Sequence, residues 1–196
     1  TELQKDNSSN SPVAVIVLGA GKGTRMKSGL PKVLHRIAGQ TMLQHVVDSV
    51  ETIAPEKVVV VIGPELENFE VNLQPHTVVI QEERLGTAHA VARARDELED
   101  FEGDIVVIFG DTPLLTSDTI CLMQQALGGP NDNSLAILGF NLDDPTGYGR
   151  IQCDNGGWVR AIVEEVDASE KQRAISEINT GIVAAPAALI CDWLAH

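Results

Sequence analysis

One short stretch constrains this chain more than any other: an apolar run that leads into a glycine-rich, cationic loop. The run Val13–Leu18 has the length of a strand buried on both faces and is rich in β-branched residues. The segment 19–25 follows at once and begins with three glycines at alternate positions. Glycine lets the backbone turn sharply and brings N–H groups close to an anion. Because Lys22, Arg25 and Lys32 lie in the same region, the sequence predicts a phosphate-binding loop.

Two common phosphate-binding patterns do not fit this loop. A Walker loop needs Gly-Lys-Ser/Thr after four spacer residues, and Thr24-Arg25 stands at those places. The dinucleotide-binding fingerprint needs a third small residue where Thr24 stands, so it matches poorly. A glycine loop that merely turns a strand into a helix is the plainer alternative, but it would not need three cations and the Pro31-Lys32 step.

Two further buried-strand patterns, Lys57–Ile62 and Asp104–Phe109, follow along the chain, and a shorter strand is expected at His76–Ile80. Helical patterns separate the strands, and they cover Thr41–Ile53, Glu65–Leu73, Thr87–Leu98 and Ser117–Leu127. Alternation of strands and helices implies parallel pairing through right-handed crossovers. We therefore predict an α/β fold, built on a Rossmann-like, doubly wound and mostly parallel sheet.

The helical patterns also predict which side chains face the sheet. In the first helix Thr41 and Gln44 resemble a capping box, and one stripe is apolar. That stripe consists of Leu43, Val46, Val47, Val50 and Ile53. In the helix predicted over Thr87–Leu98 the residues expected to point inward are Ala88, Val91, Ala94 and Leu98. The helix over Ser117–Leu127 is expected to close at Gly128-Gly129-Pro130.

Beyond Ser134 the pattern changes to short strands. They are expected at Ser134–Phe140, Gly149–Cys153, Trp158–Val163 and Ile178–Ala184. The Asn155-Gly156 step is a strong hairpin signal, so we predict an antiparallel β excursion that walls one side of a pocket. Pro186 is expected to open a final helix that runs to the chain end. Residues 1–11 are expected to form a flexible tail and residues 12–196 a single domain.

The chain is acidic, with a formal net charge of −14 and a pI near 4.6. Acidity argues against a nucleic-acid partner, because binding a polyanion depends on many lysine and arginine contacts. It also repels a nucleotide, so the clustered cations and a divalent metal must reverse the field locally. No apolar run approaches the ~20 residues that a membrane span needs. Because Cys121, Cys153 and Cys191 form no CxxC pair, we expect a reducing cytoplasm.

The glycine-rich loop and the segment Leu30–His35 together resemble the signature of the sugar-nucleotidyltransferase family. Within the family, the resemblance is strongest to the bacterial N-acetylglucosamine-1-phosphate uridylyltransferases, and it covers Val13 to about Ala184. Phe109 replaces the tyrosine that is common in the family. The further segments that match are Gln81 with Leu85–Ala88, Phe109–Asp111, Gly147–Arg150, Ile162–Glu164 and Glu177–Gly181.

This resemblance implies that UTP and N-acetylglucosamine 1-phosphate react to give UDP-N-acetylglucosamine, for cell-wall and lipopolysaccharide synthesis, and pyrophosphate. It implies Mg²⁺ as the cofactor, with Asp111 as its ligand, and catalytic roles for Arg25, Lys32 and Asp111. The implied substrate-binding residues are Leu18, Gly19, Ala20, Gly21, Lys22, Lys32, Gln81, Gly86, Thr87, Phe109, Gly110, Asp111, Gly149, Glu164 and Asn179.

The chemistry of these residues suits such roles, although each has a plainer alternative. Asp111 follows a buried strand and offers the hard oxygens that Mg²⁺ prefers, or it caps a turn. Gln81 can donate and accept toward a uracil edge, but read alone it is a solvated loop residue. The carboxylate of Glu164 can accept from sugar hydroxyls. Asn179 stands inside an apolar strand and needs a partner, for which a sugar is suitable.

The family's catalytic domain continues past the segment 193–196, and its later part supplies an asparagine that shares the metal. The resemblance therefore implies that this chain is truncated at its C-terminal end. An acetyltransferase domain that builds a homotrimer is expected only in a full-length parent. Two alternatives stay open: another sugar-1-phosphate nucleotidyltransferase, and a nucleotide-sugar-binding module without turnover.

Overall fold

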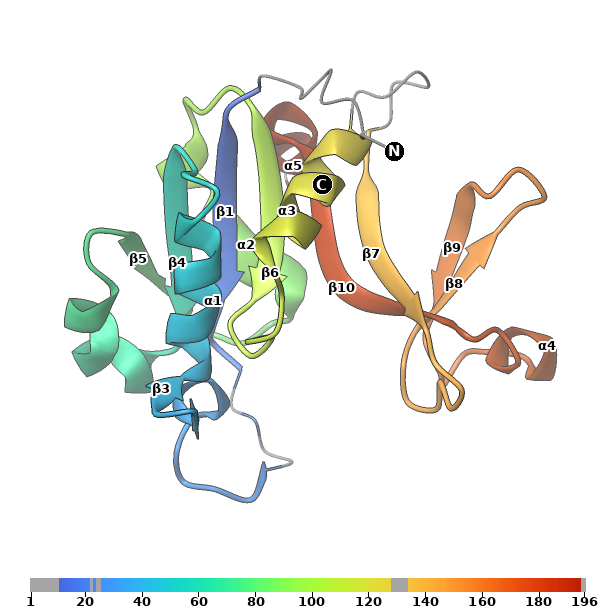
Figure 1. Ribbon diagram of the computed structural model, residues 1–196, viewed down its shortest axis with the longest axis horizontal. Helices are drawn as coiled ribbons and strands as arrows, with labels where there is room; N and C mark the ends of the chain where they lie inside the picture. Colours follow the sequence, from blue (N-terminus) through green and yellow to red (C-terminus); the bar gives the residue numbers. More distant parts are fainter. Residues whose placement is uncertain (1–10, 22, 24–25, 128–133, 195–196) are drawn as a thin grey trace, which may run out of the picture. The chain divides into compact units, whose positions relative to one another are not determined.

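The computed structural model describes residues 11–21, 23, 26–127 and 134–194 (Figure 1). They fall into two compact units, of which the first comprises Thr1–Ala136 with Ala184–His196 and the second comprises Ile137–Val183. The single domain expected over 12–196 stays a prediction. The tail expected over 1–11 lies, apart from Ser11, outside the described residues, as does the Gly128-Gly129-Pro130 helix end.

The first unit contains a parallel sheet whose strands follow the order β5-β4-β1-β6. Their bounds are β1 (Val13–Leu18), β4 (Lys57–Ile62), β5 (Thr77–Ile80) and β6 (Asp104–Phe109). Val17 of the central strand pairs with Val60 on one side and Ile108 on the other. All six residues of β1 are buried, which explains why its sequence is uniformly apolar.

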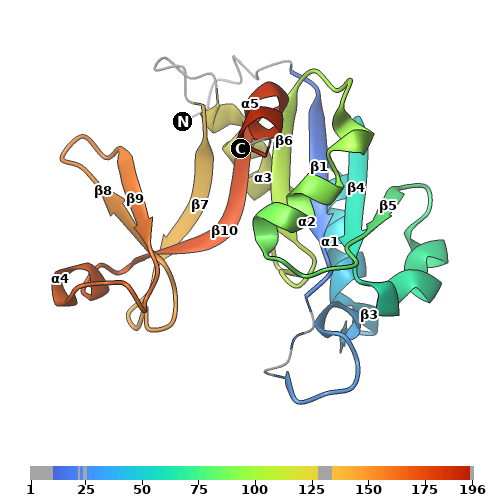
Figure 2. The same ribbon diagram turned by 180° about the vertical axis from the view of Figure 1, so that it is seen from behind.

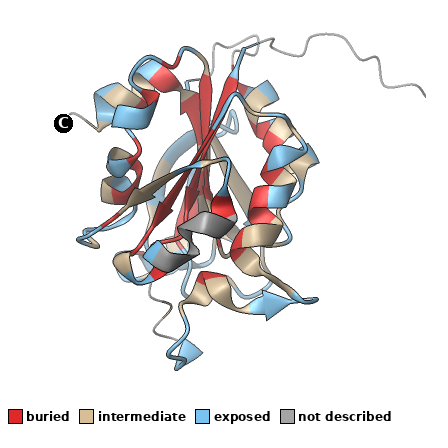
Figure 3. Cartoon of the chain, turned by 90° about the vertical axis from the view of Figure 1, so that its left-hand side faces the viewer, coloured by how far each residue is buried: buried red, intermediate tan, exposed pale blue. Residues whose placement is uncertain are grey.

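Helices cover both faces of this sheet, as the doubly wound fold requires. Helices α1 and α3 lie on one face in Figure 1, and Figure 2 shows α2 and α5 on the other. Their bounds are α1 (Met42–Glu51), α2 (Thr87–Arg93), α3 (Ser117–Ala126) and α5 (Ala187–Trp193). Figure 3 shows buried residues along the strands and on the inward stripes of the helices. The predicted α/β fold with a mostly parallel sheet is confirmed.

Shorter elements connect these layers. The 3₁₀ helices are η2 (Lys32–Leu34), η3 (Pro64–Leu73) and η4 (Asp96–Leu98). A small antiparallel pair, β2 (Arg36–Ile37) with β3 (Gln40–Thr41), precedes α1.

Helix α1 has the predicted start and most of the predicted buried stripe. Thr41 caps it by accepting a hydrogen bond from the backbone N–H of Gln44 at 3.2 Å. Only half of the predicted capping box forms, because the Gln44 side chain donates to Asp48 at 2.9 Å instead. Ile53 lies beyond the helix end and is only half-buried.

The single helix predicted over Thr87–Leu98 is wrong. The α-helix ends at Arg93, and residues 96–98 form the separate turn η4. Ala88, expected to point inward, is exposed, whereas Ala90 is buried. Alanine is small enough to suit either face of a helix, so the alanine-rich pattern left the face poorly determined.

The second unit is antiparallel, as predicted. Strand β8 (Arg150–Cys153) pairs with β9 (Val159–Val163) and with β10 (Glu177–Pro186), whose last residues belong to the first unit. The Asp154 carboxylate accepts hydrogen bonds from the N–H groups of Gly156 and Trp158 and so closes the predicted hairpin. The bond from Trp158, together with one from the Arg160 side chain, holds the pKa of Asp154 below its usual value. Strand β7 (Ala136–Asn141) pairs with β10, and helix α4 (Glu170–Arg173) was not predicted.

Within the described ranges, no helix combines the length and the apolar character that crossing a lipid bilayer requires.

Candidate functional site

The turn after β1 is fixed by the ends of its two neighbouring strands. The Gly19 N–H donates to the carbonyl oxygen of Val61 on β4 at 2.7 Å. The Gly110 N–H, just past β6, donates to the carbonyl oxygen of Leu18 at 2.9 Å. Because both bonds lie at the carboxyl ends of the parallel strands, they bring the predicted glycine-rich segment and the segment around Asp111 to one edge of the sheet. Ala20 is buried and Gly21 is exposed at this edge.

The glycine-rich segment packs directly against the start of η2. Gly23 adopts φ +59°, a left-handed conformation that favours glycine. A Cβ on Gly23 would lie 2.5 Å from Cβ of Lys32, so a larger residue would displace the lysine. Gly23 therefore has both a conformational and a steric reason to be glycine, and the steric one concerns the place of Lys32.

Lys32 and Asp111 form an ion pair. The lysine Nζ lies 2.6 Å from Oδ2 of Asp111, and the two side chains are 39% and 29% exposed. Solvent can therefore reach both groups. The structure thus brings together two of the three residues for which the family resemblance implies catalytic roles. The third, Arg25, lies outside the described residues, and so does Lys22.

The segment 81–87 is held more tightly than its polar sequence indicates. Gln81 is only 3% exposed, which corrects its reading as a solvated loop residue. Its side-chain Nε2 donates to the carbonyl oxygen of Gly86 at 3.3 Å and lies 3.0 Å from Nδ1 of His89. Gly86 has φ +109°, and the exposed Thr87 begins α2. The Gln81 side chain therefore fixes the backbone at Gly86.

The three residues implied in sugar binding lie close together in the second unit. The Asn179 N–H donates to the carbonyl oxygen of Gly149 at 2.8 Å. A Cβ on Gly149 would lie 3.0 Å from Oε1 of Glu164, so this carboxylate stands directly over the glycine. The Asn179 side chain already has an internal partner, because its Oδ1 accepts from the Gly181 N–H at 3.0 Å.

Arg150, to which sequence reasoning gave no role, anchors the backbone around Gly149. Its guanidinium donates to the carbonyl oxygens of Tyr148, Ile175 and Arg173 and pairs with Glu165, whose Oε2 lies 2.8 Å away. Arg150 is only 1% exposed. Its hydrogen bond to Glu165 holds the pKa of that carboxyl below the usual value. A cation at the start of an expected strand was only a weak signal of this role, because two of its carbonyl partners, Arg173 and Ile175, lie more than 20 residues along the chain.

Comparison with known proteins decides the family. Residues 15–177 match the family described as MobA-like NTP transferase domain. The chain belongs to this family. It is 44% identical over 182 residues to the bifunctional protein GlmU of Rhodospirillum rubrum, which covers 93% of this chain and 41% of the relative. The bifunctional protein GlmU of Paramagnetospirillum magneticum is 46% identical over 175 residues, or 89% of this chain and 39% of the relative.

A third relative, the bifunctional protein GlmU of Marinobacter nauticus, is 45% identical over 186 residues, or 94% of this chain and 40% of the relative. The chain therefore spans about two fifths of the length of the curated relatives that it matches. The family match and these relatives confirm the family resemblance read from the sequence.

NTP transferases of this family generally use a divalent metal ion. Among the described residues, no group of three or more His, Cys, Asp and Glu side chains could hold a metal by itself. The donor set nevertheless fits such an ion, because Mg²⁺ commonly takes one or two carboxylates together with phosphate oxygens and water. Asp111 supplies one solvent-accessible carboxylate beside the glycine-rich segment, and a nucleotide would bring the phosphates.

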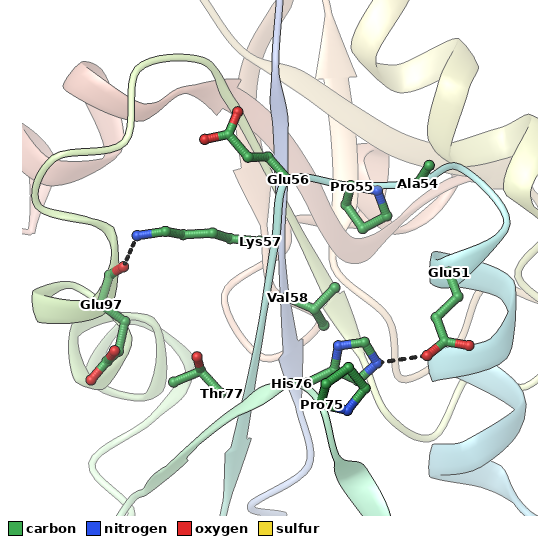
Figure 4. Close-up of a pocket in the computed structure, with 10 residues that line it drawn as sticks. All are labelled: Glu51, Ala54, Pro55, Glu56, Lys57, Val58, Pro75, His76, Thr77 and Glu97. Atoms are coloured by element: carbon green, nitrogen blue, oxygen red, sulfur yellow. Dashed lines mark hydrogen bonds and ion pairs between the residues drawn. The ribbon is translucent and has the colours of Figure 1, made fainter.

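A hollow of about 410 Å³ lies elsewhere in the first unit, as Figure 4 shows. Most of its lining residues precede or begin β4 and β5, among them Lys57 and Thr77, and Glu97 of η4 also lines it. Gly19 and Asp111 follow the opposite, carboxyl ends of the strands, and a strand of six residues spans about 20 Å. Inside the hollow, His76 pairs with Glu51 at 2.9 Å. The hollow therefore does not coincide with the candidate site.

Proposed function

We propose that this NTP transferase domain joins UTP to N-acetylglucosamine 1-phosphate, giving UDP-N-acetylglucosamine and pyrophosphate. The observation that carries the proposal is the Lys32–Asp111 ion pair at the carboxyl edge of the parallel sheet, beside the glycine-rich segment. The relatives named bifunctional protein GlmU support the same reaction class. The product would feed cell-wall precursor synthesis.

The attacking group, a sugar phosphate, is already an anion, so the reaction needs no general base. Catalysis then consists of positioning and of neutralising charge on the phosphates. Lys32 would leave Asp111 and donate to a phosphate near the reacting centre. Arg25 and Lys22 would contact the other phosphates with the backbone of residues 18–21. This local cluster of cations is what allows a chain of net charge −14 to hold a triphosphate.

Asp111 would hold the Mg²⁺ ion once Lys32 has moved to the nucleotide. The ion supplies positive charge to the phosphate oxygens. Phe109 and Gly110 place this aspartate by ending β6, and a Cβ on Gly110 would lie 2.8 Å from Cδ1 of Leu43. The small size of Gly110 therefore keeps Asp111 close to the sheet edge.

Gln81 and Gly86 would read the uracil. The Gln81 Nε2 is taken by Gly86 and His89, which leaves its Oε1 to accept from the base, and a glycine lets the base approach the backbone. The bond from Gln81 to the carbonyl oxygen of Gly86 supports this role, because it fixes one recognition element on the other. Thr87 follows at the start of α2 and would border the same base.

Gly149, Glu164 and Asn179 would contact the N-acetylglucosamine group. Their mutual proximity supports the assignment, because they come from three separate segments of the sequence. The Oδ1 atom of Asn179 is taken by Gly181, which leaves the Nδ2 donor for a sugar oxygen.

We also propose a cytoplasmic setting. Cys121, Cys153 and Cys191 are free thiols, and this agrees with a reducing compartment.

Pyrophosphate exchange tests the proposal against its two alternatives. The chain is incubated with Mg²⁺, labelled pyrophosphate and UDP-N-acetylglucosamine, and label entering UTP is measured. UDP-glucose, CDP-sugars and GDP-sugars serve as matched substrates. Exchange with UDP-N-acetylglucosamine alone is expected. Exchange confined to another sugar nucleotide would assign a different nucleotidyltransferase, and binding without exchange would assign a binding module.

A further inference from the structure

Arg84 lies in the segment that follows β5, and its sequence context indicated no role. Its Nε donates to the carbonyl oxygen of Ala20 at 2.6 Å. The same guanidinium forms an ion pair with Glu65, and the Arg84 side chain is 24% exposed. A long cationic side chain thus reaches from the base-reading segment to the turn that follows β1.

The structure makes room for this contact at Gly63. Gly63 directly follows β4, and Glu65 stands in the first turn of η3. A Cβ on Gly63 would lie 2.3 Å from Nη2 of Arg84 and 2.9 Å from Oε2 of Glu65. A Cβ essentially never comes this close to another heavy atom, so with a larger residue at position 63 the ends of the Arg84 and Glu65 side chains would have to shift from these places.

The contact at Ala20 fixes the orientation of the next peptide N–H. In a planar trans peptide the carbonyl and the N–H point in opposite directions. Because the Ala20 carbonyl points at Arg84, the N–H of Gly21 points away from it. Gly21 is exposed, and within the described part of the chain its N–H has no hydrogen-bond partner. An oriented and exposed N–H of this kind is a donor for a phosphate oxygen.

The charge of Arg84 is balanced by Glu65, so its contribution differs from that of the loop cations. A guanidinium can donate to a carbonyl and a carboxylate at the same time in a fixed geometry, which a lysine ammonium cannot reproduce. The role of Arg84 is therefore one of geometry and not of phosphate neutralisation.

We propose that Arg84 is a positioning residue for the nucleotide. By holding the Ala20 carbonyl it presents the Gly21 N–H to the phosphates of the bound nucleoside triphosphate. Because Arg84 stands between Gln81 and Gly86, it also ties the phosphate-binding turn to the base-reading segment. This inference rests on the proposed function.

Isothermal titration of the chain with UTP and Mg²⁺ tests the inference. The variants are Arg84→Gln, Arg84→Lys and Gly63→Ala. We expect each to raise the Kd for UTP about tenfold or more, the effect of losing a hydrogen bond to a charged group. Arg93→Gln is the matched control, since the exposed Arg93 also donates its Nε to a carbonyl, that of Ile80 at 3.3 Å. Its Kd should stay within about twofold of the wild type.

Kinetics separate positioning from a general structural role. The KM for UTP should rise in the variants, whereas the KM for N-acetylglucosamine 1-phosphate and the melting temperature stay close to the wild-type values. Gly63→Ala retains Arg84, so it decides the question if Arg84→Gln fails to fold. Tight UTP binding by the variants, or an equal rise of both KM values, would overturn the inference about Arg84 and leave the proposed function standing. A wild-type chain that binds no UTP would overturn the proposed function as well.

Discussion

The two units hold their candidate binding residues in different ways. In the first unit the contacts join partly exposed charges: Lys32 and Asp111 are 39% and 29% exposed, and Arg84 is 24% exposed. In the second unit Arg150 has a side chain only 2% exposed and donates to three carbonyl oxygens besides pairing with Glu165. Exposed pairs are weak and exchangeable, whereas a buried, fully bonded cation is not.

This difference indicates a division of labour. The proposed sugar-binding residues are set in place before any ligand arrives, because Arg150 joins the backbone just before Gly149 to the backbone at Ile175. The proposed phosphate-binding residues are held by contacts that a nucleotide can replace, since a phosphate oxygen competes with Asp111 for Lys32. On this proposal the sugar side would be preorganised, and the Lys32–Asp111 pair on the phosphate side would open when a nucleotide binds.

The largest expected effect is on turnover at Asp111. Asp111→Asn removes the charge that pairs with Lys32 and would hold the metal, so we expect kcat to fall about 10²-fold or more. Because the pair is exposed, stability should change by less than about 1 kcal/mol. Steady-state uridylyltransferase assays and urea unfolding measure the two quantities. A variant with normal turnover would remove Asp111 from the reaction.

The next largest expected effect is a loss of stability when Arg150 is replaced. Arg150→Gln leaves buried carbonyls and Glu165 without their donor, and we expect a loss of about 3 kcal/mol in the free energy of unfolding. Arg84→Gln, which breaks a more exposed pair, should lose less than about 1 kcal/mol. Equal losses in urea unfolding would break the comparison between the two units.

The smallest effect is the pH dependence of the contact at Glu165. Hydrogen bonding to Arg150 lowers the folded-state pKa of Glu165 below its usual value of 4.5. The contact therefore stabilises the fold fully above pH 4.5, and this stabilisation is lost as the pH falls through the lowered pKa. The urea midpoint of Glu165→Gln should consequently fall less than that of the wild type on acidification. Parallel acid profiles would show that Glu165 does not contribute.

Most of the fold could be predicted from the sequence because its strands are unusually clear. Val13–Leu18 and Lys57–Ile62 are short apolar runs that end at glycines, and a buried parallel sheet explains both features. Helix α2 was less predictable, because alanines allow either face. Its end at Arg93 is not marked in the local sequence by a glycine or a proline.

The candidate site was predictable only in part. The family resemblance found Lys32, Asp111 and the three sugar-side residues, and the structure shows each group to be contiguous within its own unit. The family resemblance gave no role to Arg84 or Arg150. Their importance lies in which carbonyl oxygens they reach, and a pattern of residue types along the chain does not contain that information.

A crystal structure of the chain with UTP and Mg²⁺ tests the central claim most directly. The account predicts that the triphosphate lies against residues 19–21, that Lys32 Nζ donates to a phosphate oxygen, and that its 2.6 Å contact with Asp111 is broken. A nucleotide bound elsewhere, with the Lys32–Asp111 pair intact, would contradict it.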